Sequence, residues 1–153
     1  MQHEVVNNVK NNRKCRFRIH QKSVQKMRNR LKELTERSKG ISNELRRNQL
    51  EEFIRGWINY YAMADMKQLM ISTDEWLRRR IRTIYWKQWK KVKTRYRNLR
   101  ALKVPEGLVH ELANSRKGYC RMGQMLNVAI TNKVIARLGY ISMTDYYLKV
   151  CEN

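Results

Sequence analysis

The sequence is poor in the residues that build cross-linked or β-rich small proteins. Its 153 residues include three cysteines, one proline and six glycines. Cys15, Cys120 and Cys151 lie far apart and form no C-x-x-C pair, so neither a disulfide framework nor a cysteine-type zinc site is expected. So little proline and glycine also argues against a β-rich chain, which needs a turn about every ten residues. The default expectation is a helical protein.

The sequence also lacks a long apolar run. Residues 1–14 are polar and rich in asparagine, which does not fit a secretory signal peptide. No segment elsewhere approaches the roughly 18 consecutive apolar residues of a membrane-spanning helix. We therefore expect a cytosolic protein with no membrane partner.

Acidic residues are scarce relative to basic ones. Lysine and arginine number 34 against 13 aspartates and glutamates, which gives a net charge of +21. This exceeds what solubility requires and indicates a polyanionic partner. Hydrophobic residues nevertheless make up 42% of the chain, so it can build a packed core and is not a disordered basic tail.

The amino-terminal region shows the period of a strand. Residues 16–20 alternate basic and apolar side chains, which is typical of a half-exposed strand. Valines within residues 5–9 could supply a partner strand across a turn at residues 11–12. We expect a short β-hairpin or strand here.

The rest of the chain has apolar residues at helical spacing. Ser42 is positioned to cap one helix, and the capping box of Ser72 and Glu75 is expected to open another. Pro105 is well placed as the first residue of a short helix. The fold class that follows is mostly α, a multi-helix bundle with a short amino-terminal β-hairpin or strand. The pattern predicts helices over residues 22–40, 42–61, 72–102, around 108–112, around 134–138 and 142–150.

Gly56 interrupts the second predicted helix. Glycine in a helix interior costs roughly 1 kcal/mol relative to alanine. We therefore expect another backbone or an aromatic ring to pack closely against Gly56.

Two stretches concentrate the positive charge. From Trp76 to Lys103 there are twelve basic residues and no acidic one, and from Lys10 to Lys39 there are twelve against two acidic ones. On helices these charges point in every direction except the apolar seam, so a broad surface could contact phosphates. Two such surfaces could clasp one nucleic acid.

A solvated helix face and a membrane-binding surface fit the basic run less well. A solvated helix face would normally include acidic residues for i,i+4 pairs, and the 76–103 stretch has none. An anionic membrane surface would require a broad face of bulky apolar residues, whereas this apolar seam is narrow. The charge pattern therefore favours nucleic-acid contact.

The tryptophans divide into two pairs. Trp57 and Trp76 are expected in the buried core. Trp86 and Trp89 lie among lysines and could stack on a base, although amphipathic aromatic residues more often pack inside the protein.

No catalytic constellation is visible. The three aspartates, Asp65, Asp74 and Asp145, are too widely separated to form a carboxylate pair for two metal ions. The histidines are isolated, His110 is best explained as a surface residue, and neither an H-E-x-x-H motif nor a phosphate-binding loop occurs. Cys120 has basic neighbours but no visible catalytic partner, so we expect an inert thiol.

Several short sequence motifs, in this order along the chain, resemble those of a known family. They are CRFRIH (15–20) followed by KS (22–23), IRGWINYY (54–61), DEWLRRRIR (74–82), WKQWK (86–90) with KTR (93–95), ANSRKGY (113–119), LGY (138–140) and DYY (145–147). Together they resemble the group II intron reverse transcriptase and maturase family, specifically the thumb or X region that follows the polymerase palm.

The resemblance implies an RNA-binding helical module. In full-length relatives such a module binds structured intron RNA, helps it fold and splice, and grips an RNA/DNA template-primer. The implied domains are an amino-terminal strand or hairpin that is a remnant of the palm (1–21), a maturase-specific thumb domain (22–104) and a carboxy-terminal helical extension packed on it (105–153).

The same resemblance predicts no catalysis by this chain alone. The sequence carries neither the polymerase fingers and palm nor the endonuclease motif of some relatives. We therefore expect no catalytic residue, no cofactor and no bound metal.

Our expectation is an RNA-binding maturase fragment whose partner is structured group II intron RNA. A non-specific DNA-binding or architectural helical protein remains the alternative, as does a protein-interaction module whose charge only keeps it soluble. The arginines at 78–82 are expected to be exposed, so that glutamine at these positions would weaken RNA binding without unfolding the helix. The candidate RNA-binding residues are Lys26, Arg28, Arg30, Arg78, Arg79, Arg80, Arg82, Lys87, Lys90, Lys91, Lys93, Arg95, Arg97, Arg116 and Lys117. The candidate core residues are Gly56, Trp57, Tyr60, Tyr61 and Trp76.

Overall fold

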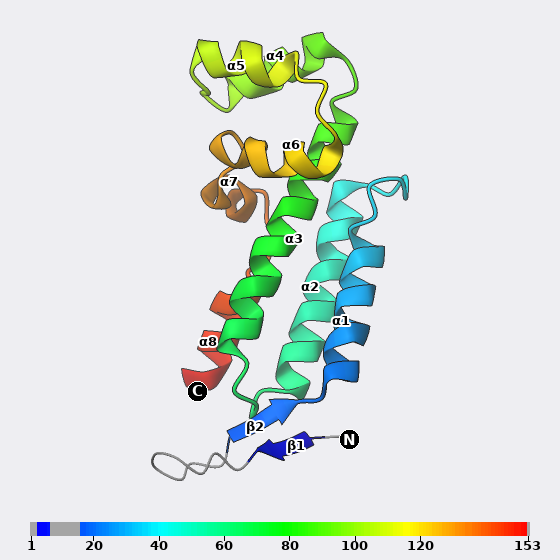
Figure 1. Cartoon of the computed structure of the whole chain (residues 1–153), viewed down its shortest axis with the longest axis vertical. Helices are drawn as coiled ribbons and strands as arrows, with labels where there is room; N and C mark the ends of the chain where they lie inside the picture. The colour runs from blue at the N-terminus through cyan, green and yellow to red at the C-terminus, as the bar shows by residue number, and fades with distance from the viewer. Residues whose placement is uncertain (1–2, 7–15, 153) are drawn as a thin grey trace. The chain divides into compact units, whose positions relative to one another are not determined.

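A computed structural model describes residues 3–6 and 16–152 (Figure 1). The described chain is mostly α-helical, as the sequence predicts. Its elements are β1 (His3–Val6), β2 (Arg16–Ile19), α1 (Gln21–Leu34), α2 (Asn43–Tyr60), α3 (Lys67–Gln88), α4 (Val92–Ala101), α5 (Glu106–Ala113), α6 (Tyr119–Met125), the 3-10 helix η1 (Leu126–Val128), α7 (Asn132–Arg137) and α8 (Met143–Glu152).

Contacts between residues divide the chain into two compact units. Unit 1 comprises residues 1–34, 42–74 and 141–153, and unit 2 comprises residues 35–41 and 75–140. Helix α3 contributes its first part to unit 1 and its second part to unit 2. The domain boundaries expected after residues 21 and 104 stay predictions.

Unit 1 is built on the pairing of α1 with α2, and α8 packs on α2. Apolar residues recur every three or four positions in α1 and α2, so each helix presents one apolar stripe to the other. The sequence pattern predicted these stripes correctly. The buried members are Val24, Met27, Leu31 and Leu34 of α1 and Leu50, Ile54 and Ile58 of α2.

The expected pairing of two amino-terminal strands is confirmed. Strands β1 and β2 pair antiparallel, with His3 opposite Ile19 and Val6 opposite Arg16. The expected partner Val9 and the turn at residues 11–12 lie outside the described residues.

Unit 2 contains the second part of α3 together with α4 to α7. Helices α4 and α5 pack on each other. The buried apolar residues of the unit include Leu77, Ile81, Ile84, Leu99, Val109, Leu112, Leu126 and Ile135.

Helix caps explain several of the boundaries. Ser42 Oγ accepts a hydrogen bond from Leu45 N at 3.1 Å, so the predicted cap of α2 is confirmed. Ser42 therefore sets the start of α2 as the sequence indicates. Ser142 Oγ accepts from Asp145 N at 3.3 Å, which confirms the cap predicted for α8.

The third predicted helix, over residues 72–102, is wrong at its start and in being continuous, although α4 ends at Ala101, close to the expected end. Helix α3 begins at Lys67 rather than Ser72, and Ser72 lies inside it with its hydroxyl donating to the Leu69 carbonyl at 3.0 Å. Residues 89–91 then interrupt the helix, because Lys91 has extended backbone angles (φ −90°, ψ 141°) and caps α4. Apolar residues keep helical spacing on both sides of this break, so the pattern carried no sign of it.

Three smaller differences complete the comparison. Helix α1 ends at Leu34, well before Gly40, whose φ of +53° belongs to the following turn. Pro105 caps α5 from one position before its first helical residue. Helix α6 was not predicted, and Gly118 directly precedes it as its N-cap residue.

Candidate nucleic-acid interface

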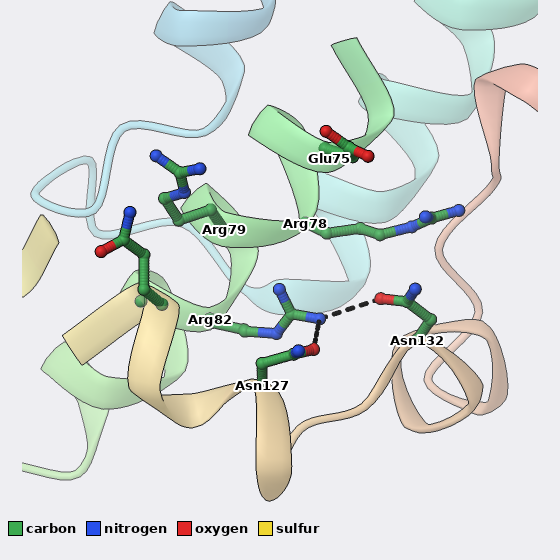
Figure 2. A pocket seen from close by; sticks show the side chains of 8 residues that line it. Glu75, Arg78, Arg79, Arg82, Asn127 and Asn132 are labelled. Carbon is green, nitrogen blue, oxygen red and sulfur yellow. Dashed lines mark hydrogen bonds between the residues drawn. The ribbon is translucent and has the colours of Figure 1, made fainter. Parts of the chain in front are cut away.

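Three arginines of α3 in unit 2 line a polar cavity of about 360 Å³ (Figure 2). Arg78 and Arg79 lie four and three residues before Arg82, so both neighbour Arg82 on the surface of the helix. Gln124 and Asn127 come from α6 and η1. The cavity is also lined by Glu75, Gly123 and Asn132. It therefore combines guanidinium groups with amide side chains, both of which can hydrogen-bond to phosphates and base edges.

Arg82 forms the inner wall of this cavity. Its Nε donates to the Ile130 carbonyl at 2.7 Å, and its Nη2 donates to Asn127 Oδ1 at 3.0 Å and to Asn132 Oδ1 at 2.9 Å. Burial, and then the positive charge of its arginine neighbours on α3, lower the pKa of Arg82. Only 6% of the residue is exposed, so the expectation that it is exposed is wrong. Arg82 ties residues 127–132 to α3, and its interior hydrogen bonds depend on the folding of a segment about 50 residues away.

Arg78 and Arg79 are half-buried and reach the cavity from the same helix. In Figure 2 their guanidinium groups point away from each other. Two cations held apart around one space suit an anion that carries several oxygens, such as a phosphodiester.

Gly123 brings α6 close to α3. A Cβ atom at this position would lie 2.7 Å from Thr83 Cγ2 and 2.9 Å from the Arg79 carbonyl oxygen. Real Cβ atoms do not approach other atoms so closely, so only glycine fits without a shift. Gly123 also lines the cavity, and sequence reasoning had not singled it out.

Arg80 lies on another face of α3 and holds the segment that precedes α2. Its Nε donates to Thr35 Oγ1 at 2.6 Å and its Nη2 to the Thr35 carbonyl at 3.3 Å. Its guanidinium lies over the half-buried ring of Trp76, 5.1 Å from the centroid. Burial, followed by the charge of Arg37, lowers the pKa of Arg80, while Glu36 raises it. Arg80 therefore has a structural role in unit 2 in addition to any contact with RNA.

Lys87 makes a similar link. Its Nζ donates to Ser38 Oγ at 3.0 Å, so it joins the same segment to the last turn of α3.

The side chain of Arg95 also makes its contacts within the protein. It donates to the Trp89 carbonyl at 3.0 Å and to the Ala113 carbonyl at 3.3 Å, and it lies 4.1 Å from the centroid of the Trp86 ring. Trp86 and Trp89 are 3% and 9% exposed, with ring centroids 6.3 Å apart. Both tryptophans belong to the core of unit 2, so neither offers a free face to a base.

The remaining candidate cations point to solvent. In unit 2 a cluster of exposed cations occupies the α3–α4 junction and the first turns of α4. A further pair precedes α6, where Lys117 Nζ also contacts Met125 Sδ at 3.5 Å. In unit 1 the cations of α1 are exposed, and Arg30 pairs with Glu33 at 2.7 Å. The exposed candidates are Lys26, Arg28, Arg30, Lys90, Lys91, Lys93, Arg97, Arg116 and Lys117.

The residues predicted for the core in α2 and at its end are not among the fully buried ones. Tyr60 is 58% exposed, and Trp57 and Tyr61 are half-buried. The close packing expected at Gly56 is wrong, because a Cβ atom built there meets nothing within 4 Å. The apolar period of α2 runs through Leu50, Ile54 and Ile58 instead, and these residues form the core.

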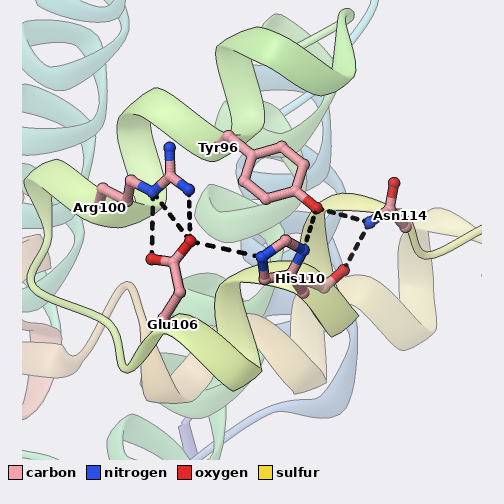
Figure 3. Close-up of polar contacts among 5 residues, drawn as sticks. All are labelled: Tyr96, Arg100, Glu106, His110 and Asn114. Atoms are coloured by element: carbon pink, nitrogen blue, oxygen red, sulfur yellow. Dashed lines mark hydrogen bonds and ion pairs between the residues drawn. The ribbon is translucent and has the colours of Figure 1, made fainter.

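A polar network joins α4 to α5 in unit 2 (Figure 3). The Tyr96 hydroxyl lies 2.6 Å from His110 Nδ1 and accepts a hydrogen bond from Asn114 Nδ2 at 2.8 Å. Arg100 pairs with Glu106, which raises the pKa of Arg100 and lowers that of Glu106. His110 is exposed, as predicted, but it is not isolated, since this network surrounds it.

The described residues contain neither a candidate metal site nor a candidate membrane-spanning helix. Among residues 3–6 and 16–152, no group of three histidine, cysteine or acidic side chains could hold a metal ion. Across the same residues, no helix has both the length and the hydropathy needed to cross a bilayer.

Comparison with known proteins gives the family. The model of the maturase-specific domain of group II introns matches residues 24–102, which is just over half of the chain. The match covers α1 to α4 apart from the first three residues of α1. A search of curated proteins found no match. The matched segment contains the cavity arginines and most of the exposed cations described above. The chain belongs to the group II intron maturase-specific domain family.

Proposed function

We propose that this chain binds structured group II intron RNA and helps it reach its splicing-competent fold. In a full-length relative the same module would grip the template-primer as the thumb of a reverse transcriptase. The chain would act in the bacterial cytoplasm or inside an organelle, wherever the intron is transcribed. A maturase-family domain needs an RNA-binding surface, and this chain offers one of matching charge.

The cavity of unit 2 carries the proposal. Arg78 and Arg79 present two cations around an amide-lined space, and their neighbour Arg82 is fixed by three hydrogen bonds. A site held in place by the protein loses little conformational entropy on binding. Exposed lysines at the α3–α4 junction extend the positive surface in the same unit, namely Lys90, Lys91 and Lys93. A structured RNA would contact the cavity with one phosphate and the lysines with others.

Filter binding across a salt titration tests the proposal. The purified chain is titrated against a structured group II intron RNA, an unrelated RNA of matched length and a duplex DNA of equal length. Preference for intron RNA that persists near physiological salt supports maturase recognition. Equal, strongly salt-dependent binding to all three would favour the non-specific nucleic-acid alternative, and no binding would favour a protein-interaction module.

Two double variants test whether the cavity is the RNA-binding surface. We expect Arg78→Gln combined with Arg79→Gln to weaken intron RNA binding. Lys67→Gln combined with Lys149→Gln removes the same charge from exposed positions in unit 1 and serves as the control. An equal loss in both double variants would mean that net charge, and not the cavity, determines affinity.

A further inference from the structure

Helices α1 and α2 form a second concave surface, in unit 1, which the cavity of unit 2 does not include. Its volume is about 660 Å³. We call it the aromatic groove. Its walls are Lys26 and Arg30 from α1 and Phe53, Trp57, Tyr60 and Tyr61 from α2 and its end.

The aromatic wall combines one exposed ring with two half-buried ones. Trp57 and Tyr61 have centroids 4.7 Å apart at 44°, and Tyr60 and Tyr61 have centroids 4.7 Å apart at 82°. Tyr60 is 58% exposed, and Trp57 and Tyr61 are half-buried. The rings pack on one another and leave the Tyr60 ring accessible to a flat ligand.

The lack of a side chain at Gly56 leaves space beside the aromatic rings. It lies in the middle of an 18-residue helix and lines the groove, yet nothing within 4 Å of its position would obstruct a side chain. Glycine is therefore not required by packing or by the backbone angles of a helix. Its effect is to leave free space beside the rings of Trp57 and Tyr60.

The opposite rim is positively charged. Lys22, Lys26 and Arg30 recur every four residues, so they lie along one edge of α1. Arg30 is paired with Glu33, whereas Lys26 has no ion pair with any acidic side chain that the structure describes. Glu52 also lines the groove, so the two walls differ in charge and the cations are confined to α1.

We propose that the aromatic groove binds an unpaired nucleotide of an RNA strand. The base would stack on Tyr60 or Trp57 in the space above Gly56, and its phosphates would contact Lys26 and Lys22. Aromatic faces beside a row of cations are the features that sites for single-stranded nucleic acid share, because every base offers a π-face and every nucleotide a phosphate. A protein segment is a weaker candidate because the row of cations along α1 favours an anionic partner. The inference rests on the proposed function and adds to it a site for unpaired nucleotides.

The test uses the full chain and a short single-stranded RNA that contains one 2-aminopurine. Stacking on an aromatic ring quenches the fluorescence of this base. We expect quenching by the unaltered chain with the single strand, and none when the same RNA is annealed to its complement. Gly56→Leu fills the groove and Tyr60→Ala removes the exposed ring, and each should weaken binding of the single strand on the order of tenfold.

The variants separate binding from folding. Leucine is a better helix former than glycine, so Gly56→Leu should raise the thermal midpoint while it weakens binding. Asn48→Leu adds the same side chain to an exposed position of α2 outside the groove and should bind as the unaltered chain does. Quenching that survives in Gly56→Leu, or that is lost equally in Asn48→Leu, would overturn the proposal.

The groove and the proposed function can fail separately. If the unaltered chain binds intron RNA but leaves 2-aminopurine unquenched, the groove proposal is wrong and a protein segment becomes its better occupant, while the proposed function stands. If the chain quenches the single strand but shows no preference for intron RNA, the groove is supported and the maturase function is not.

Discussion

The carboxylate of Asp74, in α3, accepts a hydrogen bond from Ser142 Oγ at the start of α8, at 2.9 Å. The same carboxylate accepts from the backbone N–H groups of Met143 and Thr144, each at 2.9 Å. Asp74 is 2% exposed, so these bonds replace the water that it loses. An aspartate far away in sequence therefore satisfies the first donors of a helix that Ser142 alone would cap only in part.

Asp74→Ala should destabilise unit 1. The change leaves two backbone donors and one hydroxyl without their acceptor, for which we expect a loss of about 2–4 kcal/mol in the free energy of unfolding. Chemical denaturation followed by circular dichroism measures it. The control is Asp145→Ala, an exposed acid in the first turn of the same helix, which should cost less than about 1 kcal/mol. Equal costs would mean that charge near α8, and not the buried cap, is what stabilises the helix.

The local features of the fold could be predicted from sequence. The stripe of α1 and the cap at Ser42 depend on residues within a few positions of one another, so periodicity and capping rules were sufficient. The ends of α3 were not predictable in this way. Ser72 and Glu75 form a capping box in sequence, but the helix had already begun at Lys67.

The sequence predicted where the candidate site lies in the chain, but not the role of each residue in it. Charge counting found the arginines of α3, but it could not separate Arg78 from Arg82, which share a helix face. The difference arises because residues 127–132 fold over Arg82 and supply its acceptors. Trp86 and Trp89 illustrate the same limit, since flanking lysines indicate exposure while the rings are buried.

Arg82→Gln should unfold unit 2 more readily. Glutamine cannot reach all three acceptors, and burial leaves the unpaired ones without water, so we expect a loss of about 2–4 kcal/mol. The exposed Arg97→Gln should change stability by no more than about 0.5 kcal/mol. Urea denaturation compares them. A stable Arg82→Gln protein would contradict the structural role assigned to this side chain.

Gly123→Ala should also destabilise unit 2. The added methyl would clash with Thr83 Cγ2 and with the Arg79 carbonyl oxygen. Because moving the backbone is costly, we expect the free energy of unfolding to fall by about 1–3 kcal/mol. Thermal unfolding measures it, and Thr83→Ser in the same chain should restore part of the loss because it removes the nearer atom. Gly107→Ala, in α5, has open space and should be neutral or slightly stabilising. A neutral Gly123→Ala would mean that α6 does not approach α3 as closely as described.

The pairing of Arg100 with Glu106 makes the contact of α4 with α5 sensitive to acid. Hydrogen bonding to Arg100 lowers the pKa of Glu106 in the folded state. The pair therefore contributes stability above the carboxyl's unfolded pKa, and this contribution is lost as pH falls through the lower folded value. Thermal midpoints of the unaltered chain and Arg100→Gln should differ slightly at neutral pH, and the difference should shrink as the pH falls below the ordinary pKa of glutamate, about 4.3. A difference that stays constant with pH would show that Arg100 acts by packing on Tyr96 instead.

The exposed lysines at the α3–α4 junction should determine the salt dependence of RNA binding. Lys90, Lys91 and Lys93 are exposed, so each is free to neutralise one phosphate and release its counterions. Replacing all three by glutamine should reduce the slope of log affinity against log salt by about 0.7–0.9 for each phosphate that is no longer neutralised, with little change in stability. Arg78→Gln with Arg79→Gln should reduce the slope as well, and under the proposed function it should also reduce the preference for intron RNA, because the arginines would hold a phosphate beside the amide groups of the cavity. The triple lysine variant should leave that preference intact. If both sets of variants changed slope and preference in the same proportion, the cavity would provide charge alone, and recognition of the intron would have to reside elsewhere in the chain.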